Sequence, residues 1–569
     1  MNNIHASIDD YLLRPRVAYF SMEIALAPDI PTYSGGLGVL AGDTLRAAAD
    51  MALPMVAVTL VSRGGYFRQE IDEAGRQVEH PDIWEPAHHA THLKATVALT
   101  LEGRDVWVGG WLYIVQSLAN RGIPVLLLDT DLPVNHPDDR QITYQLYGGD
   151  TRMRLKQEAV LGMGGVAMLQ ALGFDIFTYH MNEGHSSLLT MALIKRHSFD
   201  RADVRPGECR FELPKVRDLC AFTTHTPVDA GHDQFPYDLV TTVLGDIPDL
   251  ATLKMLAGED KLNMTRLALN LSEYVNGVAK RHAEVSGRMF PGYAVHAVTN
   301  GVHASTWTAE PFASLYDSQL PGWCHEPELL IRADRLPDET IWKAHTRAKA
   351  DLIDKVRTLT GVVMDPDKPI IGFARRMTAY KRADLLFSDL ERLKAIARHH
   401  PFQIVLAGKA HPRDDMGHQL IEALHRHIRE LAGSVSITFL PNYDMNVALA
   451  MVSGADVWLN TPLRPLEASG TSGMKAAFNG VPQLSVLDGW WVEGWEEGLT
   501  GWAIGEDKLQ ANGNDALALY DKLEHVVLPL WHGDRAGWIA VMKGAISRNA
   551  AFFNSHRMMR RYASEAYLR

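Results

Sequence analysis

Short apolar runs alternate with segments of helical period throughout the second half of this 569-residue chain. The runs are Lys368–Ala374, Pro401–Ala407, Ser434–Leu440, Ala455–Asn460 and Pro482–Asp488. Between them lie segments such as Ala379–Ala397 and Asp414–Leu431, which have the apolar spacing of helices. Strand, helix and strand at this spacing predict a doubly wound parallel sheet, which binds ligands beyond the carboxyl ends of its strands.

The first half also has an α/β pattern, with more decoration. We expect strands at Val17–Ile24, Pro54–Ser62, Pro124–Asp129, Asp175–His180, Asp218–Thr223 and Tyr293–Val298. A helix is expected at Gly38–Met51, and hairpins are expected to turn at Asp72–Gly75 and Glu102–Gly103. A long helical segment, Glu339–Leu359, marks the boundary region. Because the chain is too long for one ordinary core, we expect two doubly wound α/β domains, at residues 1–345 and 346–545, facing each other across a cleft.

The charge pattern argues against two classes of partner. Lysine and arginine are scattered, and the formal net charge is −12. Nucleic acids and anionic membranes need a basic face, so neither is expected as a partner. No uncharged apolar run approaches the roughly 20 residues of a membrane helix, and Met1–Arg16 lacks the apolar core of a secretory signal.

The cysteines indicate the compartment. Cys209, Cys220 and Cys324 show no metal-ligand spacing, and such scarcity in a long chain suggests a reducing environment. We therefore expect a cytoplasmic protein without a metal site.

The densest candidate for chemistry is the run EASGTSGMK, at Glu467–Lys475. Gly470–Gly473 forms a small-residue turn before a short helix that ends at Gly480, and free N–H groups at such a turn suit an anion. Lys475 falls in the first helical turn, where a cation opposes the helix dipole. It is either a partly desolvated or nucleophilic amine, or a solvated lysine in an ordinary turn.

A second candidate is the cationic run RRMTAYKR at Arg375–Arg382, directly after an expected strand. Cations at the end of a buried strand cost desolvation free energy unless an anion lies among them. Arginine offers a planar fork to phosphate, and lysine adds a point charge. The alternative is a solvated loop that leads into a helix.

Three polar motifs stand out in the first half. YSGGLG at Tyr33–Gly38 precedes an expected helix, whereas TTHTP at Thr223–Pro227 and TNG at Thr299–Gly301 each follow an expected strand. Glycines let the backbone approach a ligand closely, although such turns are often only structural. His225 is either a ligand-site residue or a hydrogen-bonded core histidine. The histidine-rich stretch Pro86–His92 has no carboxylate partner and is expected to be a surface loop.

Taken together, these motifs resemble the glycogen and α-glucan phosphorylase family. The run EASGTSGMKAAFNG, followed by LDGWWVEG, resembles the family's pyridoxal-phosphate lysine region, and RRMTAYKR resembles its phosphate-binding loop. YSGGLG, FSMEIA, TRMRLKQE, TTHTPV, VNGVAKRH and TNGV extend the similarity, which runs from about residue 17 to 505 in the family's order.

The resemblance implies roles for particular residues. Lys475 would hold pyridoxal phosphate as a Schiff base that serves only for anchoring. Arg376 and Lys381 would bind substrate phosphate, close to the cofactor phosphate at Gly470 and Thr471. Tyr443 and Trp307 would line the cofactor pocket. The sugar site would consist of Leu37, His225, Asn300, Glu467, Ser469 and Gly470, with His225 contributing mainly its backbone carbonyl.

The resemblance also implies the reaction and the architecture. The reaction is reversible phosphorolysis of α-1,4-glucan or maltodextrin ends to glucose 1-phosphate with retention, with the cofactor 5′-phosphate acting in acid–base catalysis. The fold is the two-domain glycosyltransferase architecture called GT-B. Residues 546–569 would form a carboxyl-terminal helix that packs back on the first domain, and family members are usually homodimers.

Several positions depart from the larger family members. The phosphate loop begins with Arg375-Arg376 instead of Lys-Arg, and Asp444 stands where those members have an arginine. Ser472-Gly473 replaces Gly-Asn, and His303-Ala-Ser305 replaces Thr-Pro-Arg. The long amino-terminal extension of animal members does not precede the first expected strand, so we expect no control by AMP.

Three other functions remain open from the sequence. A nucleotide-sugar glucan synthase shares the fold and an Arg/Lys pair but lacks a Schiff-base lysine. A phosphorylase of another glucoside would use the same residues. A non-catalytic glucan-binding protein would have no reason to retain Lys475, Arg376 and Lys381 together.

Overall fold

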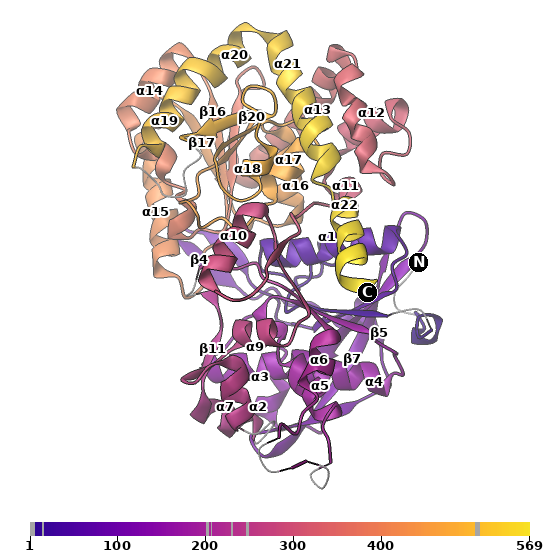
Figure 1. Ribbon diagram of the computed structural model, residues 1–569. Helices are drawn as coiled ribbons and strands as arrows, with labels where there is room; N and C mark the ends of the chain where they lie inside the picture. The colour runs from indigo at the N-terminus through magenta and orange to yellow at the C-terminus, as the bar shows by residue number, and fades with distance from the viewer. Residues whose placement is uncertain are drawn as a thin grey trace.

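The computed structural model describes residues 6–13, 16–200, 204–205, 208–228, 231–245, 250–506 and 513–568. Residues 1–5 and 14–15 of the Met1–Arg16 segment, and residue 569 at the carboxyl end, lie outside these ranges. The described chain is a mixed α/β structure built on two large sheets. We call the elements around the first sheet the first lobe, drawn in indigo to magenta in Figure 1, and those around the second sheet the second lobe, drawn in pink-red to yellow.

The first lobe is built on a 10-stranded sheet with the order β14-β13-β10-β9-β1-β2-β8-β7-β5, in which β6 pairs with β7. Its strands are β1 (Val17–Phe20), β2 (Met55–Leu60), β5 (Thr91–His92), β6 (Val97–Leu101), β7 (Arg104–Gln116), β8 (Gly122–Asp129), β9 (Thr178–Asn182), β10 (Cys220–Thr223), β13 (Tyr274–Gly277) and β14 (His296–Ala297). The strands from β14 to β8 are parallel, whereas β7 and β5 are antiparallel to their neighbours.

Helices bury both faces of the centre of this sheet, so β1, β2 and β8 are buried along nearly their whole length. In β1, Val17 and Tyr19 join one core, and Ala18 and Phe20 join the other. The first core contains α1 (Gly36–Asp50), and the second contains α3 (Thr151–Ala159), α4 (Gly165–Ala171) and α5 (Leu189–Arg196). The other helices of this lobe are α2 (Pro137–Arg140), α6 (Leu213–Asp218), α7 (Tyr237–Leu244), α8 (Leu250–Ala257), α9 (Met264–Asn270) and α10 (Lys280–Met289).

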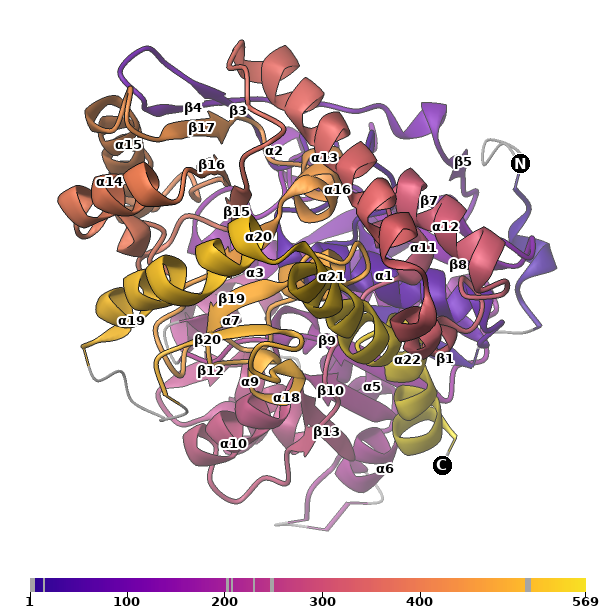
Figure 2. The same cartoon turned by 90° about the horizontal axis from the view of Figure 1, so that it is seen from above.

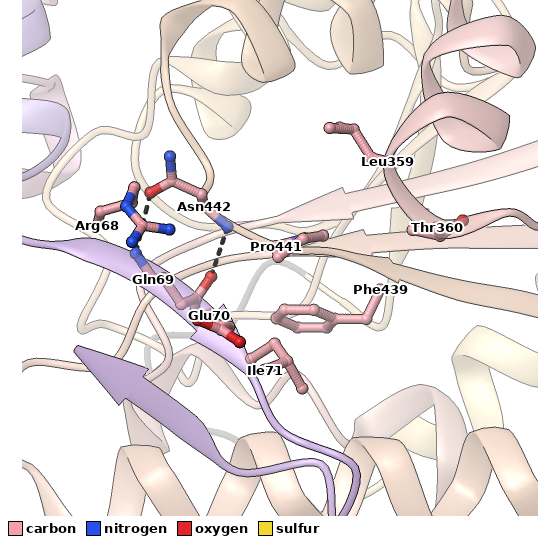
Figure 3. A pocket seen from close by; sticks show the side chains of 9 residues that line it. All are labelled: Arg68, Gln69, Glu70, Ile71, Leu359, Thr360, Phe439, Pro441 and Asn442. Carbon is pink, nitrogen blue, oxygen red and sulfur yellow. Dashed lines mark hydrogen bonds between the residues drawn. The ribbon is translucent and has the colours of Figure 1, made fainter. Parts of the chain in front are cut away.

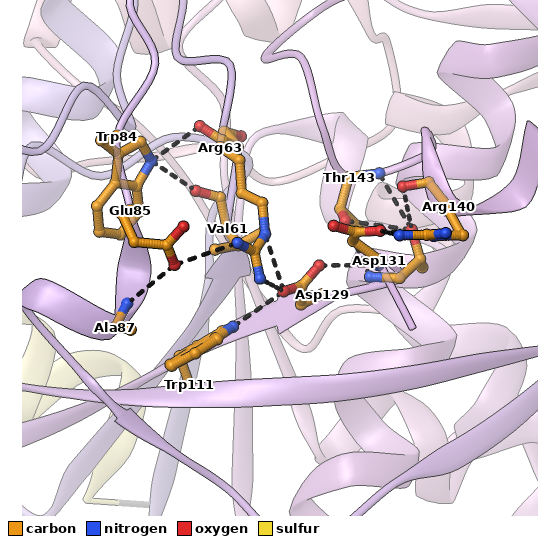
Figure 4. A network of polar contacts seen from close by, with 12 residues as sticks. Val61, Arg63, Trp84, Glu85, Ala87, Trp111, Asp129, Asp131, Arg140 and Thr143 are labelled. Carbon is orange, nitrogen blue, oxygen red and sulfur yellow. Dashed lines mark hydrogen bonds and ion pairs between the residues drawn. The ribbon is translucent and has the colours of Figure 1, made fainter. Parts of the chain in front are cut away.

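A polar network closes the end of β8 (Figure 4). Arg63 donates to Asp129 Oδ2 from Nη2 at 2.8 Å, and the Trp111 indole N–H donates to the same oxygen at 2.9 Å. Arg63 also pairs with Glu85 at 3.3 Å. The network therefore joins β7, β8 and the loop after β2 at the carboxyl end of β8.

The second lobe is built on a six-stranded parallel sheet with the order β17-β16-β15-β18-β19-β20. Its strands are β15 (Ile370–Ala374), β16 (Gln403–Ala407), β17 (Ser436–Leu440), β18 (Val457–Asn460), β19 (Gln483–Val486) and β20 (Gly501–Ile504). The chain moves outward from β15 to β17 and then returns to β18, so the winding reverses between β15 and β18. In doubly wound sheets this reversal is where ligands bind.

Helices surround the second sheet and lead back to the first lobe. They are α11 (Ala304–Trp307), α12 (Glu310–Gln319), α13 (Asp338–Thr360), α14 (Leu390–His399), α15 (Asp415–Glu430), α16 (Met445–Gly454), α17 (Ser472–Ala477), α18 (Trp491–Gly494), α19 (Asp515–Lys522), α20 (Leu528–Gly533), α21 (Arg535–Gly544) and α22 (Ser555–Tyr562). Figure 1 shows α22 descending from the second lobe to lie beside α1, which it contacts. Met558, Met559 and Tyr562 of α22 are buried in the same core as α1.

A hairpin of the first lobe reaches over to the second. It consists of β3 (Arg68–Ile71) and β4 (Gln77–His80) and lies beside β17 and α15 in Figure 2. Gln69 and Asn442 exchange two hydrogen bonds, from Gln69 N–H to Asn442 Oδ1 at 3.0 Å and from Asn442 N–H to Gln69 Oε1 at 2.9 Å (Figure 3). A small second hairpin pairs β11 (Gln234–Pro236) with β12 (Lys261–Asn263).

Most of the expected elements are confirmed, including both hairpins and the strands of the second half. The expected helix at Ala379–Ala397 is wrong over its first half, because short turns occupy this segment and α14 begins only at Leu390. The strand expected at Tyr293–Val298 shrinks to β14, and β13 and β20 were not expected.

Two kinds of feature are absent from the described residues. None of the helices in those ranges has the length and apolar character needed to cross a membrane. Within the same ranges, no group of three or more His, Cys, Asp or Glu side chains is placed to hold a metal ion.

Candidate functional site

The centre of the candidate site is a buried lysine. Lys475 lies in α17 with 7% of its surface exposed, and its Nζ is 4.0 Å from the centre of the Trp307 ring. Burial lowers the pKa of Lys475 to about 8, although the nearby charge of Asp43 opposes the shift. The Trp307 indole N–H donates to Asp43 Oδ2 at 2.8 Å. At neutral pH this lysine is therefore a neutral amine, and hence a nucleophile, far more often than a solvated lysine is.

The turn before the lysine is held tightly against the sheet. Gly470 adopts φ 75°, a left-handed conformation that glycine reaches without strain. A Cβ at Gly473 would overlap Gln483 Oε1 and lie 2.9 Å from the Trp490 ring. Ser472 Oγ accepts a hydrogen bond from the Trp458 indole N–H at 3.0 Å. The Ser472-Gly473 pair is thus matched to its neighbours in β18 and β19.

Two cations converge on one carboxylate beside this turn. Arg375 Nη2 and Lys381 Nζ each lie 2.6 Å from Glu467 Oε2, and Arg375 Nη1 donates to Asn460 Oδ1 at 2.7 Å. Burial would raise the pKa of Glu467, but the charges of Arg375 and Lys381 outweigh it and lower the pKa. These ion pairs therefore join the loop after β15 to the loop after β18, at the point where the strand order of the sheet reverses.

Arg376 points away from this cluster, toward the first lobe. Its Nη2 lies 3.4 Å from Ser34 Oγ in the glycine-rich segment, and the residue is exposed. The sequence predicted Arg376 and Lys381 as a pair, whereas the structure brings Lys381 to Arg375 and Glu467. The hydroxyl of Thr378, which lies between Arg376 and Lys381 in the sequence, is buried and has no hydrogen-bond partner in the described part of the chain.

Glu23 holds the glycine-rich segment in place. Its Oε2 accepts the N–H groups of Ser34 at 2.6 Å and Gly35 at 3.2 Å, and its Oε1 accepts from the Tyr147 hydroxyl at 2.8 Å. Leu37, an expected sugar-site residue, is half-buried at the start of α1. Glu23 belongs to the FSMEIA motif, but its role was not foreseen.

His225 and Asn300 lie just beyond the ends of strands in the first lobe. The His225 N–H donates to Glu183 Oε2 at 2.8 Å, and its ring Nε2 lies 2.6 Å from Asn182 Oδ1. Burial lowers the pKa of His225 far below its usual value, so the ring is neutral. Asn300 is 4% exposed, and its Oδ1 finds no hydrogen-bond partner among the described residues.

The remaining predicted residues flank the lysine turn and α16. Ser469 accepts the Trp490 N–H through its carbonyl at 2.9 Å. Tyr443 is half-buried, directly before Asp444. Asp444 caps α16, because its Oδ1 accepts the Val447 N–H at 2.8 Å. This departure from the larger family members therefore has a structural role.

Asp488 was not predicted from the sequence, although it lies in the LDGWWVEG motif. Its carboxylate accepts the Glu467 N–H and the Gly489 N–H, each at 2.9 Å. Burial raises the pKa of Asp488 to about 7. Asp488 and Glu467 line the same small cavity, together with Arg375, Ser469 and Gly470. The sequence motif alone could not reveal the contact between Asp488 and Glu467, because this contact depends on how the two loops approach each other.

Comparisons with known proteins agree with one another. A family model described as carbohydrate phosphorylase matches residues 228–525. Maltodextrin phosphorylase of Thermococcus litoralis is 38% identical over 594 residues, which cover 97% of this chain and 70% of that protein. Glycogen phosphorylase of Aquifex aeolicus is 34% identical, with 99% of this chain and 88% of that protein covered. Glycogen phosphorylase of Mycobacterium tuberculosis is also 34% identical, with 100% and 74% covered.

Proposed function

The chain belongs to the carbohydrate phosphorylase family, and we propose that it is an α-glucan phosphorylase, a glycosyltransferase that moves a glucosyl unit between the non-reducing end of an α-1,4-glucan and inorganic phosphate with retention. One observation carries this proposal: a buried lysine with a lowered pKa follows directly after a small-residue turn, and a cluster of cations lies beside that turn. A nucleotide-sugar synthase needs no such lysine.

The residues around Lys475 fit pyridoxal phosphate. The buried amine suits covalent attachment, and the Trp307 face offers a flat wall for an aromatic ring. The unpartnered Thr378 hydroxyl and the cations Arg375 and Lys381 suit a phosphate group. When bound, pyridoxal phosphate supplies a phosphate group for acid–base catalysis. We propose that Gly470, Thr471 and Tyr443 complete its pocket.

Substrate phosphate is proposed to bind to Arg376 and Lys381. Arg376 reaches toward Ser34, so an anion held by it lies next to the glycine-rich segment of the first lobe. Cations there lower the repulsion between two neighbouring phosphate groups and stabilise charge that develops during transfer. Lys381 would then exchange part of its contact with Glu467 for the phosphate.

The glucosyl unit is proposed to bind across Leu37, His225, Asn300, Glu467, Ser469 and Gly470. The neutral His225 ring is held by Asn182, which leaves its backbone carbonyl for the sugar. Asn300 offers a buried oxygen that needs a donor, and a sugar hydroxyl is one. Glu467 provides a carboxylate acceptor for another hydroxyl.

The finer architecture is also a proposal. We infer a GT-B arrangement of two Rossmann-like domains facing across a cleft, at residues 1–345 and 346–545, with residues 546–569 as a carboxyl-terminal helix on the first domain. The structure differs from these bounds in one respect, because α11, α12 and the start of α13 pack in the core of the second sheet. The strand order of the second sheet and the position of α22 support this inference. We further propose a cytoplasmic homodimer that acts on glucan or maltodextrin.

The proposal is tested by incubating the purified protein with maltodextrin and inorganic phosphate and measuring glucose 1-phosphate, with its pyridoxal phosphate content determined in parallel. Product formed by protein with about one cofactor per chain is the expected result. Cofactor without product points to a phosphorylase of another glucoside. Absence of both points to a nucleotide-sugar transferase or a non-catalytic protein.

Two variants, with one surface control, test the roles of Lys475 and Arg376. Lys475→Ala should lose both cofactor and activity, while Lys394→Ala on the surface of α14 should keep both. Arg376→Ala should raise the KM for phosphate by about 10- to 100-fold, the loss typical of a charged hydrogen bond, with much less effect on glucan binding. An equal loss toward both substrates would contradict the assignment of Arg376.

A further inference from the structure

The loop that carries Asn300 is held by the far end of the chain. Arg557, in α22, donates from Nη2 to the carbonyl oxygens of Thr299 at 2.9 Å and Asn300 at 2.8 Å. Its Nε donates to the Phe552 carbonyl at 2.9 Å, and the guanidinium lies 4.8 Å from the centre of the Phe552 ring. The two sides of the guanidinium group are thus bonded to different segments, so that Arg557 links α22 to the loop that carries Asn300. We call this link the bracket.

Main-chain pairing closes the same loop against the segment before α22. The Val302 N–H donates to the Phe553 carbonyl at 3.1 Å, and the Ser555 N–H donates to the Val302 carbonyl at 2.9 Å. A Cβ at Gly301 would overlap the Asn554 carbonyl oxygen. The backbone on the carboxyl side of Asn300 is therefore held closely against the segment before α22.

The second lobe holds the loop from its other side. Glu493, in α18, accepts the Thr299 hydroxyl at 2.9 and 3.0 Å and the Lys280 N–H at 2.9 Å. Burial lowers the pKa of Arg557 to about 10, and the charge of Glu493 opposes the shift, so the guanidinium stays charged at neutral pH. Asn300 is consequently fixed by charged groups from two elements that lie far from it in the sequence.

The loop that the bracket holds carries a buried polar atom without a hydrogen-bond partner. Asn300 Oδ1 is buried, and no described residue donates to it, although the main-chain N–H groups of Val298, Asn300 and Val302 are all hydrogen-bonded. A hydrogen bond weakens steeply when its atoms shift by a few tenths of an ångström. Fixing the loop before the ligand arrives avoids an ordering cost on binding.

We propose that Arg557 is a positioning residue that holds Asn300 in the geometry needed to bind the glucosyl unit. The inference rests on the proposed function, since the ligand of Asn300 is taken to be the transferred sugar. It assigns to the carboxyl-terminal helix a role in substrate affinity in addition to its packing on α1.

The test compares two arginines of the same helix. Arg557→Met keeps the apolar stem but removes the donors, whereas Arg560→Ala removes only a surface ion pair with Glu328. The Kd of glucose 1-phosphate, measured by tryptophan fluorescence, should rise about tenfold for Arg557→Met. It should stay within about twofold of the wild-type value for Arg560→Ala. The KM for inorganic phosphate should change little in both variants.

A double-mutant cycle separates positioning from general damage. Asn300→Ala should weaken glucose 1-phosphate binding by about tenfold, and adding Arg557→Met should weaken it no further, because the group being positioned is gone. Multiplicative losses, or an equal rise in the KM for phosphate, would overturn the inference. If Arg557→Met does not fold, Arg557→Lys retains a charged donor, and the same cycle is run with it. Wild-type protein without phosphorolysis would instead refute the proposed function.

Discussion

At the scale of single residues, the ionisation of Lys475 is the property on which attachment of a cofactor depends. A free lysine ionises near pH 10.4, but burial brings the pKa of Lys475 to about 8. Only the neutral amine attacks a carbonyl, and it becomes the major form once the pH exceeds the pKa. We expect the rate of pyridoxal phosphate incorporation into cofactor-free protein to rise up to about pH 8 and then to level off. A rate that still climbs steeply to pH 10 would show that Lys475 is solvated.

Asp43 provides the matched control for this prediction. Its carboxylate favours the charged form of Lys475, so Asp43→Asn should lower the pKa further and move the profile to lower pH. The asparagine oxygen still accepts the Trp307 indole N–H, so the wall of the pocket should be kept. A profile that moves to higher pH would contradict the direction of this effect.

The sequence predicted which segments form the buried candidate site better than it predicted the contacts between them. It singled out Lys475, Glu467 and Lys381, and all three lie in the buried region beside the reversal of the second sheet. It did not foresee that Arg375, and not Arg376, pairs with Glu467, which lies 92 positions away. Adjacent residues leaving a strand point in opposite directions, and only the packed loops decide which one faces inward.

At the scale of elements, two helical glycines should respond oppositely to alanine. In α17, a Cβ at Gly473 would overlap Gln483 Oε1, so Gly473→Ala should cost about 1–3 kcal/mol through overpacking. In α10, a Cβ at Gly287 meets nothing within 4 Å, so Gly287→Ala should stabilise that helix by about 0.5–1 kcal/mol. Thermal unfolding should show a lowered Tm for the first variant and an unchanged or raised Tm for the second. Equal shifts would mean that the turn yields to the new methyl group.

The elements themselves were predictable where local chemistry decides them. The DEAG turn between β3 and β4 and the glycine after Glu102 produce the expected hairpins. The segment at Ala379–Ala397 contains good helix formers, yet Arg382 adopts φ 48° and its side chain bonds the carbonyls of Thr461 and Pro462. Tertiary contacts thus override propensity there, while β20 escaped notice because it is only four residues long and begins with glycine.

At the scale of the whole molecule, the two lobes are joined at several separate places. The hairpin of β3 and β4 contacts the loops after β16 and β17, and α22 packs on α1. Glu493 bonds Thr299, and Arg376 approaches Ser34. These links surround the loops that carry the candidate site, so the relative position of the lobes and the geometry of the site depend on each other.

Gln77 is the residue of the hairpin through which this dependence can be tested. Its side chain donates to the Ala410 carbonyl at 3.0 Å and accepts the Ala410 N–H at 2.9 Å, and both residues are buried. Gln77→Ala would leave these buried groups unpaired, at about 1–3 kcal/mol, so the lobes should separate locally more often. Amide hydrogen exchange at residues 408–410 should then be about tenfold faster or more, while exchange in β19 stays unchanged. Glu73→Ala, at the exposed tip of the same hairpin, is the control and should alter neither. Unchanged exchange at 408–410 in Gln77→Ala would show that the other links alone keep the lobes together.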